Sequence, residues 1–594
     1  MDCAQGYGKW RDGVFFVLAV AVAAWQCFYL ALDTHLGGLG NGLHQWHALA
    51  VSAANALVLL SPYWLLRSRW RWLVWVPLVL LTVWCLMQVC YCRAYDDLMP
   101  VRSLAMTGNV NRTLVDSFLS LLCWRDLLLV VPVVLLLAWQ LIAVGAENAT
   151  SRFKPFSTTM LAALLAATMG YATPDGNYEK RFLYNFSNRD YFALNGLIPY
   201  CTYSFYQAVS HHHSITAADR STINGFLQAQ CPQYTDNRYC SNPLQRNLVL
   251  IIVESLHSWP IGMQVDGREV TPRLNRLIGS EGVIYAPHVL FQTGHGHSSD
   301  AHFMYNTGLL PLRDDVVSVF YGDGPYPSLA DALTGYDCRM IVCDDKGYWN
   351  QAVTSQSYGF KQLYAREHLA ASGALQRHSS VDDAAMTDFA ATLLPQLRHP
   401  FFLEMVTMTM HTPYPQDKVR HSWILDSDTL NAEARGYLNC VNLTDSCIGA
   451  FIDALHLNGM DNNTVVAIVS DHTQLYRNRV MGVSDYDASP DDWGIPLLIS
   501  GCDTTLHYGP VIGQVDVFPT LLDVMGANSY PWKGLGHSIL RYDIKSAIQP
   551  RNMSVLGDST SLTPQQRQAW DISRLLILDR QHQFNNSNQP IINQ

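Results

Sequence analysis

Charged residues are scarce in this sequence. Only 15% of its 594 residues are Asp, Glu, Lys or Arg, whereas about a quarter is usual in soluble globular domains. The first 175 residues hold 11 Lys and Arg against 9 Asp and Glu, which leaves 28 against 40 for the remainder. No part is strongly basic, which argues against a nucleic-acid partner. The aromatic content of 11% excludes disorder over most of the length, because such residues fill packed cores.

The sequence also lacks closely spaced cysteine pairs of the kind that hold zinc. The eight cysteines after residue 175 form an even set without a Cys-x-x-Cys spacing, which is consistent with an oxidising compartment. Cys231 and Cys240 flank a short polar turn and are the best disulfide candidates. Cys338 and Cys343 lie in an apolar run, where buried free thiols are as plausible as a bridge.

Long apolar runs are concentrated at the N-terminal end. A bilayer core of about 30 Å requires roughly 20 apolar helical residues, and five stretches meet this requirement, approximately 13–32, 45–66, 72–92, 119–145 and 156–173. The first run is too long for a cleavable signal peptide and further spans follow it, so we interpret it as an anchor. Residues 1–174 are therefore expected to form a five-helix transmembrane domain.

Basic residues indicate the orientation of this domain. Three arginines, the first of them Arg67, follow the second span, and Arg152 and Lys154 follow the fourth. Under the positive-inside rule, these loops and the N-terminus are cytoplasmic. Five crossings then place everything after about residue 174 on the outer, periplasmic side of the cytoplasmic membrane.

Arg125 and Asp126 form an ionisable pair beside the fourth span. An intramembrane pair of this kind can mark a functional site. At a span boundary, side chains that reach the headgroup region are the simpler interpretation, and this is the one we favour.

Two further segments frame the outer domain. Residues 175–245 are an aromatic-rich linker, in which the segment Tyr191–Val209 is predicted to form an interfacial helix on the membrane surface. Residues 546–594 are a C-terminal segment that ends in a polar tail, QHQFNNSNQPIINQ, with the composition of a disordered region.

Residues 246–545 show the pattern of an α/β domain. Short apolar runs, predicted as buried strands, alternate with helical stretches and lie at 247–255, 337–345, 401–411, 464–472 and 495–500. This alternation predicts a mostly parallel sheet with helices on both faces. Ligands of such folds bind beyond the carboxyl ends of the strands.

Chemically capable side chains stand at those strand ends. Glu254 ends the first run, His411 the third, and Asp471 and His472 the fourth, while Ser298 lies in a Gly-rich turn that opens a helix. Two carboxylates, an imidazole and a hydroxyl can together hold one divalent cation. Such an ion lowers the pKa of the hydroxyl and neutralises an anionic substrate oxygen. The pattern predicts a metal-dependent enzyme.

Successive sequence blocks resemble a known family. NLVLIIVESLHSWP, FQTGHGHSSDAHFM, KGYWNQ, HTPY, NNTVVAIVSDH and QVDVFPTLLDVMG, in this order, are similar to the lipoteichoic acid synthase type of the alkaline phosphatase/sulfatase superfamily. The resemblance implies that Glu254, Ser298, Asp471 and His472 bind one Mn²⁺ or Mg²⁺, with Zn²⁺ as a further option. It also implies that Ser298 is the nucleophile, while Trp349 and His411 line a pocket for the phosphoglycerol group.

The sequence departs from the family pattern at four positions. Val342 and Gln351 stand where the family has a His and an Arg that contact glycerol phosphate, and His297 and His302 replace a Lys and a Glu near the nucleophile. These changes leave the identity of the transferred headgroup open. The Cys-x-Pro-x-Arg sequence of formylglycine sulfatases is absent, which disfavours sulfatase chemistry of that kind.

The expected reaction is the transfer of a phospholipid headgroup to a hydroxyl. Ser298 would attack phosphatidylglycerol and form a covalent intermediate, and a glycan or glycolipid acceptor would then receive the phosphoglycerol. His411 and His297 are the candidate proton carriers. Phosphoethanolamine transfer, and hydrolysis by a phosphodiesterase or sulfatase-type enzyme, are the alternatives. The expected partners are the membrane, a lipid donor and the acceptor, without nucleic acid.

Overall fold

The computed structural model divides the chain into two compact units, residues 1–107 with 115–212, and residues 108–114 with 213–594. We describe each unit by itself. The residues that the structure describes are 2–34, 42–95, 98–101, 119, 121–142, 153–171, 188–210, 215–229, 245–313, 315–371, 376–377, 380–412, 414, 423–473, 493–527, 529–550 and 553–579. Cys231, Cys240 and the polar tail after residue 579 lie outside them.

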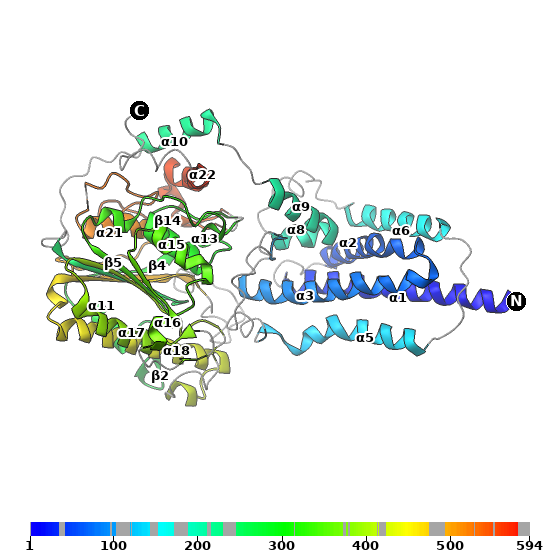
Figure 1. Ribbon diagram of the computed structural model, residues 1–594, viewed down its shortest axis with the longest axis horizontal. Coiled ribbons are helices and arrows are strands. Elements are labelled where there is room, and N and C mark those ends of the chain that lie inside the picture. Colours follow the sequence, from blue (N-terminus) through cyan, green and yellow to red (C-terminus); the bar gives the residue numbers. More distant parts are fainter. Residues whose placement is uncertain are drawn as a thin grey trace. The chain divides into compact units, whose positions relative to one another are not determined.

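The first unit is helical (Figure 1). Its described helices are α1 (Asp2–Thr34), α2 (Gly42–Leu60), η1 (Ser61–Trp64), η2 (Ser68–Val74), α3 (Trp75–Tyr95), η4 (Trp124–Asp126), α5 (Leu127–Ile142), α6 (Phe153–Tyr171), α8 (Asn188–Asn195) and α9 (Leu197–Ser210). Within the described residues, three stretches are long and apolar enough to cross a membrane, Trp10–Leu32, Arg69–Arg93 and Trp124–Ile142. The other two predicted spans are also helical, as α2 and α6, but they are not among the described stretches that are long and apolar enough to cross a membrane.

Polar side chains of helix α2 contact the segment Tyr191–Val209, which was expected to form an interfacial helix. That segment is two helices, α8 and α9, which break at Gly196. Asn55 of α2 accepts a hydrogen bond from the backbone N–H of Ile198 at 2.8 Å, and His47 contacts the carbonyl of Leu194 at 3.0 Å. A Cβ at Gly196, whose φ is +82°, would lie 2.2 Å from the Asn55 amide nitrogen. Phe192 and Tyr200 are buried in the core of this unit.

Pro132 inside α5 leaves backbone carbonyls without their helical donors, because proline has no N–H and disrupts the preceding turn. Side chains of α1 satisfy them. Trp25 donates its indole N–H to the carbonyl of Leu128 at 2.9 Å, and Gln26 donates its amide to the carbonyl of Leu129 at 3.0 Å. Neighbouring helices commonly compensate a proline in this way within a membrane.

Asp126 pairs with Arg93 of α3 and not with its neighbour Arg125. The two nitrogens of the Arg93 guanidinium lie 2.8 and 2.9 Å from the Asp126 carboxylate oxygens. Tyr29 and the backbone N–H of Cys123 also donate to this carboxylate. Asp126 is 4% exposed, so the interpretation of a side chain reaching the headgroups is wrong for Asp126. The pair instead joins α1, α3 and η4.

The second unit is built on a nine-stranded sheet of order β12-β4-β11-β10-β1-β9-β5-β6, with β13 paired to β4. Strand β11 runs antiparallel to its two neighbours and the other described pairings of this sheet are parallel, so the sheet is mixed but mostly parallel. The strands are β1 (Asn247–Val253), β4 (Val283–Leu290), β5 (Asp337–Val342), β6 (Gln362–Tyr364), β9 (Phe401–Val406), β10 (Thr464–Ser470), β11 (Ile495–Ser500), β12 (Leu506–His507) and β13 (Ile512–Gly513).

Helices cover both faces of this sheet, as predicted (Figure 1). Alternate residues of a strand point to opposite faces, and the two faces of β1 belong to two separate apolar cores. One face is covered by α12 (Ser298–Thr307), α13 (Val317–Phe320), α14 (Leu329–Ala332), α21 (Val517–Val524) and α22 (Pro564–Leu578), and the other by α11 (Pro272–Ile278), α17 (Asp383–Leu393) and α18 (Ala432–Leu457).

Smaller elements complete this unit. They are α10 (Ala217–Ala229), α15 (Gln351–Ser357), α16 (Arg366–Ala371), η6 to η11 (Tyr348–Asn350, Leu394–Gln396, Trp423–Asp426, Asp461–Asn463, Gln514–Asp516 and Ser559–Ser561), and the two-stranded pairs β2 and β3 (Gln264–Val265 and Arg268–Glu269), β7 and β8 (Gln376–Arg377 and Ser380–Val381), and β14 and β15 (Ser546–Ile548 and Val555–Gly557). Cys338 and Cys343 are buried free thiols.

Candidate active site

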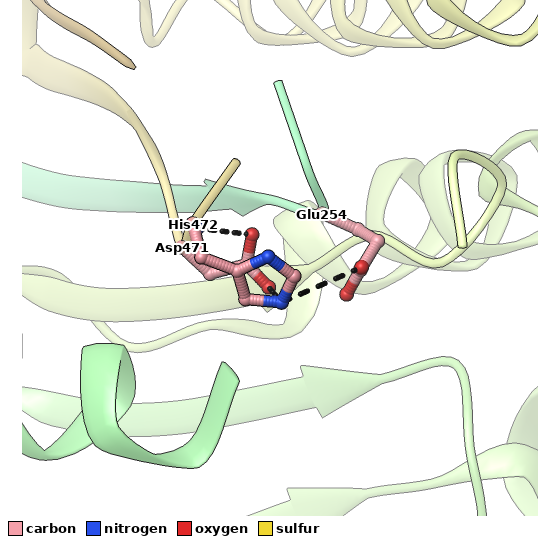
Figure 2. Close-up of side chains that lie close together, drawn as sticks. All are labelled: Glu254, Asp471 and His472. Atoms are coloured by element: carbon pink, nitrogen blue, oxygen red, sulfur yellow. Dashed lines mark hydrogen bonds and ion pairs between the residues drawn. The ribbon is translucent and has the colours of Figure 1, made fainter. Parts of the chain in front are cut away.

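Three predicted ligands meet at the carboxyl ends of β1 and β10. These parallel neighbours pair from Asn247 with Thr464 to Val253 with Ser470, so the residues that follow them lie side by side. Figure 2 shows Glu254, Asp471 and His472 turned toward one another. Nε2 of His472 lies 3.5 Å from Asp471 and 3.8 Å from Glu254, and one donor atom of each residue lies within 4.8 Å of the others. All three are buried.

Ser298, the first residue of α12, completes this group. Its hydroxyl donates to Oε2 of Glu254 and contacts Nε2 of His472, both at 3.3 Å. Ser299 faces elsewhere, because its hydroxyl donates to the carbonyl of Gly296 at 2.7 Å and accepts from Ser318 at 2.9 Å. The two neighbouring hydroxyls therefore occupy different environments, and Ser298 is the one beside the carboxylates.

The turn before α12 is held by its own sequence. The Asp300 carboxylate accepts from the backbone N–H groups of Gly294 and Gly296 at 2.8 and 3.0 Å. A Cβ at Gly296 would lie 2.1 Å from that carboxylate, so glycine is required for the close approach. His297 has a φ of +42°, which is strained for a residue with a side chain. Ser255 and Trp349 also have positive φ, and such residues cluster at active sites.

Two buried carboxylates, Glu254 and Asp471, lie beside the His472 imidazole here. Burial, followed by the negative charge of Glu254, raises the pKa of Asp471 to about 6. Burial opposes protonation of His472, but the charges of Asp471 and Glu254 outweigh it and raise its pKa. Among the residues that the structure describes, no Lys or Arg forms an ion pair with either carboxylate. The group therefore fits a divalent cation, which oxygen and imidazole donors bind well.

His411 and His297 border this group. The edge of the His297 ring lies against the His472 ring with centroids 5.1 Å apart, and burial, then the charge of His472, lowers the pKa of His297. Burial also lowers the pKa of His411, against the effects of its contact with the Thr412 carbonyl and of the Asp344 carboxylate. Both imidazoles therefore favour the neutral form, which can accept a proton.

Trp349 lies in a tight turn that is linked to the start of α12 by hydrogen bonds through Ser318. It is buried in η6, and the next residue, Asn350, donates to the carbonyl of Ser318 at 2.9 Å. The Ser318 hydroxyl in turn contacts Ser299. Gln351 is buried, and its Oε1 has no hydrogen-bond partner among the residues that the structure describes. Val342 is buried at the end of β5.

The structure adds residues that the sequence argument missed. Asp344 follows β5 as Asp471 follows β10, and this spacing was a usable signal. Burial raises its pKa to about 6, and its charge acts on His411. Gln514 donates to the carbonyl of Asp471 at 2.6 Å and to the Tyr305 hydroxyl at 3.0 Å. Gln514 opens the block QVDVFPTLLDVMG, but its contact with Asp471, more than forty positions away, was not predicted.

Family models match most of the chain. Residues 6–216 match the lipoteichoic acid synthase N-terminal domain, and residues 246–527 match the sulfatase family. The chain is 23% identical over 569 residues to the lipoteichoic acid synthase of Staphylococcus saprophyticus, covering 91% of this chain and 85% of that protein. It is also 23% identical over 563 residues to lipoteichoic acid synthase 1 of Bacillus subtilis, with 91% and 86% covered.

A solved structure shares the fold of the second unit. The crystal structure of the lipoteichoic acid synthase LtaP from Listeria monocytogenes aligns with a TM-score of 0.50 and 19% identity, over 62% of this chain and 98% of that one. The sheet and the strand-end site define a member of the alkaline phosphatase/sulfatase superfamily. Within that superfamily the chain belongs with the lipoteichoic acid synthase-like enzymes, because both its N-terminal and its sulfatase segments match them.

Proposed function

We propose that this enzyme transfers phosphoglycerol from phosphatidylglycerol to a hydroxyl of a glycan or glycolipid, through a covalent intermediate on Ser298. The observation that carries the proposal is the position of the Ser298 hydroxyl, at 3.3 Å from both Glu254 and His472. The relatives named lipoteichoic acid synthase support phosphoglycerol as the group. The apolar N-terminal helices support a lipid donor.

The proposed metal site is Glu254, Asp471, His472 and the Ser298 hydroxyl, with Mn²⁺ or Mg²⁺ as the expected ion and Zn²⁺ as a further option. The closeness of two buried carboxylates and an imidazole supports this assignment. A divalent cation at this position lowers the pKa of a serine hydroxyl and offsets negative charge on phosphoryl oxygens.

The first half-reaction cleaves the lipid. Ser298 Oγ attacks phosphorus and loses its proton, the bond from phosphorus to the diacylglycerol oxygen breaks, and diacylglycerol leaves after taking up a proton. In the second half-reaction the acceptor hydroxyl attacks phosphorus, and the bond to Ser298 Oγ breaks as the serine regains its proton. His297 and His411 are the proposed proton carriers, and the lowered pKa of each supports this because it favours the neutral form.

Mass spectrometry of the full-length protein tests this proposal. The purified protein in detergent, supplied with Mn²⁺, would be mixed with phosphatidylglycerol and digested to locate the adduct. We expect a phosphoglycerol adduct on Ser298 that disappears when an acceptor is added. An unmodified Ser298 under conditions in which diacylglycerol is released would contradict the covalent mechanism.

A phosphoethanolamine donor is the second candidate. Val342 and Gln351 replace the His and Arg that the resemblance assigns to glycerol phosphate, and within the described part of the chain the buried Gln351 Oε1 lacks a hydrogen-bond partner. A neutral acceptor atom suits an ammonium group better than an arginine would. Parallel incubations with phosphatidylglycerol and phosphatidylethanolamine separate the two, because the adducts differ in mass.

The proposed orientation places the catalytic unit outside the cytoplasm after five membrane crossings. The basic residues near Arg67 and Arg152 support it through the positive-inside rule. A reporter fused after residue 210 should be active only outside the cytoplasm, and a reporter fused near Arg69 only inside. The opposite pattern would put the catalytic unit in the cytosol and exclude a donor in the outer leaflet.

A further inference from the structure

Helix α12 begins at Ser298 and makes a second polar contact on the face that bears this serine. Residues four apart in an α-helix lie on one face, and Ser298, His302 and Asn306 of α12 have this spacing. Ser298 faces Glu254 and His472. His302 and Asn306 are buried one and two turns further along, where both approach Glu404 of β9.

Glu404 is an unexpected residue at this position. It lies in the middle of the apolar strand FFLEMV, beside Leu250 of β1 and Met340 of β5, and is fully buried. A carboxyl group in such a place lowers stability unless hydrogen bonds compensate. Its Oε2 accepts from the Asn306 amide at 2.8 Å, and its Oε1 lies 3.9 Å from Nδ1 of His302.

Glu404, His302 and Asn306 form a polar cluster without net charge at neutral pH. Burial raises the pKa of Glu404 to about 8, against the effect of its hydrogen bond with Asn306. Burial lowers the pKa of His302 to about 4. Apolar residues of similar volume would usually be at least as stabilising at such a site. Stability alone therefore does not account for the cluster, whereas the directional hydrogen bond restricts how α12 can rotate on the sheet.

We propose that Glu404, His302 and Asn306 form a positioning cluster that fixes the rotation of α12 and so directs Ser298 toward Glu254 and His472. This inference rests on the proposed function of Ser298 as the nucleophile. At a Cα radius of about 2.3 Å, a rotation of about 25° moves a residue by about 1 Å. A displacement of that size can lower turnover about 10²-fold.

Other contacts of α12 set the size of the expected effect. Asp300 binds the glycine turn, and the Tyr305 hydroxyl binds the carbonyl of Ser470. These contacts remain when Glu404 is changed, so the helix stays in place but loses one of its rotational restraints. We therefore expect a partial loss of turnover and not a complete one.

The test compares four variants of the full-length protein in detergent with phosphatidylglycerol as donor. Glu404→Leu and Asn306→Ala should lower kcat by about 10- to 100-fold with KM nearly unchanged, whereas Glu404→Gln should restore most of kcat, because its amide oxygen still accepts from Asn306. Met405→Ala is the matched control. Met405 is the next residue of β9 and packs in the core on the opposite face of the sheet, so this change should lower Tm and leave kcat unchanged.

The outcomes separate the inference from the function on which it rests. If the wild-type protein forms no adduct on Ser298, the proposed function fails. If the wild type turns over and Asn306→Ala keeps the wild-type kcat per folded molecule, the positioning cluster is wrong. A loss of kcat in Met405→Ala in proportion to its loss of Tm would also overturn it, since the effect would then be one of general stability. Asn306→Ala keeps the test decisive if Glu404→Leu does not fold.

Discussion

One site in each unit buries carboxylates, and the two sites do so in different ways. In the helical unit, the Asp126 carboxylate receives hydrogen bonds from the Arg93 guanidinium, from Tyr29 and from the backbone of Cys123. In the second unit, Glu254 and Asp471 are buried side by side, and no Lys or Arg forms an ion pair with them among the described residues. A buried charge that is matched by its own chain holds helices together, whereas unmatched charges of one sign mark a place for a ligand of the opposite sign.

The largest expected effect comes from Ser298, the proposed nucleophile. Ser298→Ala should abolish the covalent adduct and lower turnover by on the order of 10³-fold or more, as removal of a nucleophile does in other enzymes. Ser299→Ala should cost no more than the roughly 0.5–2 kcal/mol of a helix-capping contact. Steady-state kinetics and mass spectrometry measure both. A dead Ser299→Ala beside an active Ser298→Ala would show that the nucleophile is the neighbouring serine.

The next prediction concerns Glu254 and Asp471, the two carboxylates of the proposed metal site. Chelation of divalent ions should abolish turnover, and Asp471→Ala should lose bound metal while the domain stays folded. Asp445→Ala is the control, because Asp445 binds the backbone N–H groups of Arg273 and Leu274 at the start of α11 and lies outside the site. It should keep its metal, as measured by elemental analysis of the purified protein. Full activity in metal-free protein would contradict the assignment.

The ion pair between Arg93 and Asp126 predicts a loss of stability when one partner is removed. Arg93→Leu leaves the buried Asp126 carboxylate without its cation, which costs on the order of 3 kcal/mol for a buried pair. The double variant Arg93→Leu with Asp126→Leu should recover much of this loss, because no unpaired charge remains. Thermal unfolding in detergent would compare the three proteins. Equal stability of the single and double variants would mean that the pair contributes little to the helical unit.

The last prediction concerns pH. The folded state raises the pKa of Glu404 from an ordinary value of 4.5 to about 8, and the nearby groups His302, Asn306 and Tyr358 supply no cation, because burial lowers the pKa of His302. The folded state therefore holds a proton that the unfolded chain has released. Stability should fall as pH rises from about 4.5 through 8, by at most about 1.4 kcal/mol per pH unit.

Glu404→Gln removes this titration and sharpens the test. The apparent Tm of this variant should fall less than that of the wild type between pH 6 and pH 8. Asp516→Asn would be a useful comparison, since burial also raises the pKa of Asp516, to about 7. Parallel curves for Glu404→Gln and the wild type would show that Glu404 does not titrate in this range.

Local patterns in the sequence indicated much of the second unit. The five apolar runs correspond to β1, β5, β9, β10 and β11, although the strands end two to five residues before the predicted runs in four cases. Polar residues close to those ends, such as Glu254, His411 and Asp471, could be read directly, because parallel strands bring their carboxyl ends to one edge. Strand β4 was missed, since Pro287 and His288 interrupt its apolar pattern.

The helical unit shows the limit of the same reasoning. Hydropathy located the helices, since a bilayer requires long apolar segments. It did not show that Asp126 pairs with Arg93, because the partner is 33 positions away and Arg125 is the nearer cation in the sequence. It also did not show that Asn55 binds the break between α8 and α9.

The sequence by itself determined the fold class, the lipoteichoic acid synthase-like family and the residue types at the strand ends, because these depend on local periodicity and on the order of the blocks. Only the tertiary structure decided which groups share one environment. It placed the Ser298 hydroxyl, and not that of Ser299, beside Glu254 and His472, and it brought Glu404 under the same face of α12. Such pairings depend on packing between distant segments, which short-range sequence patterns do not encode.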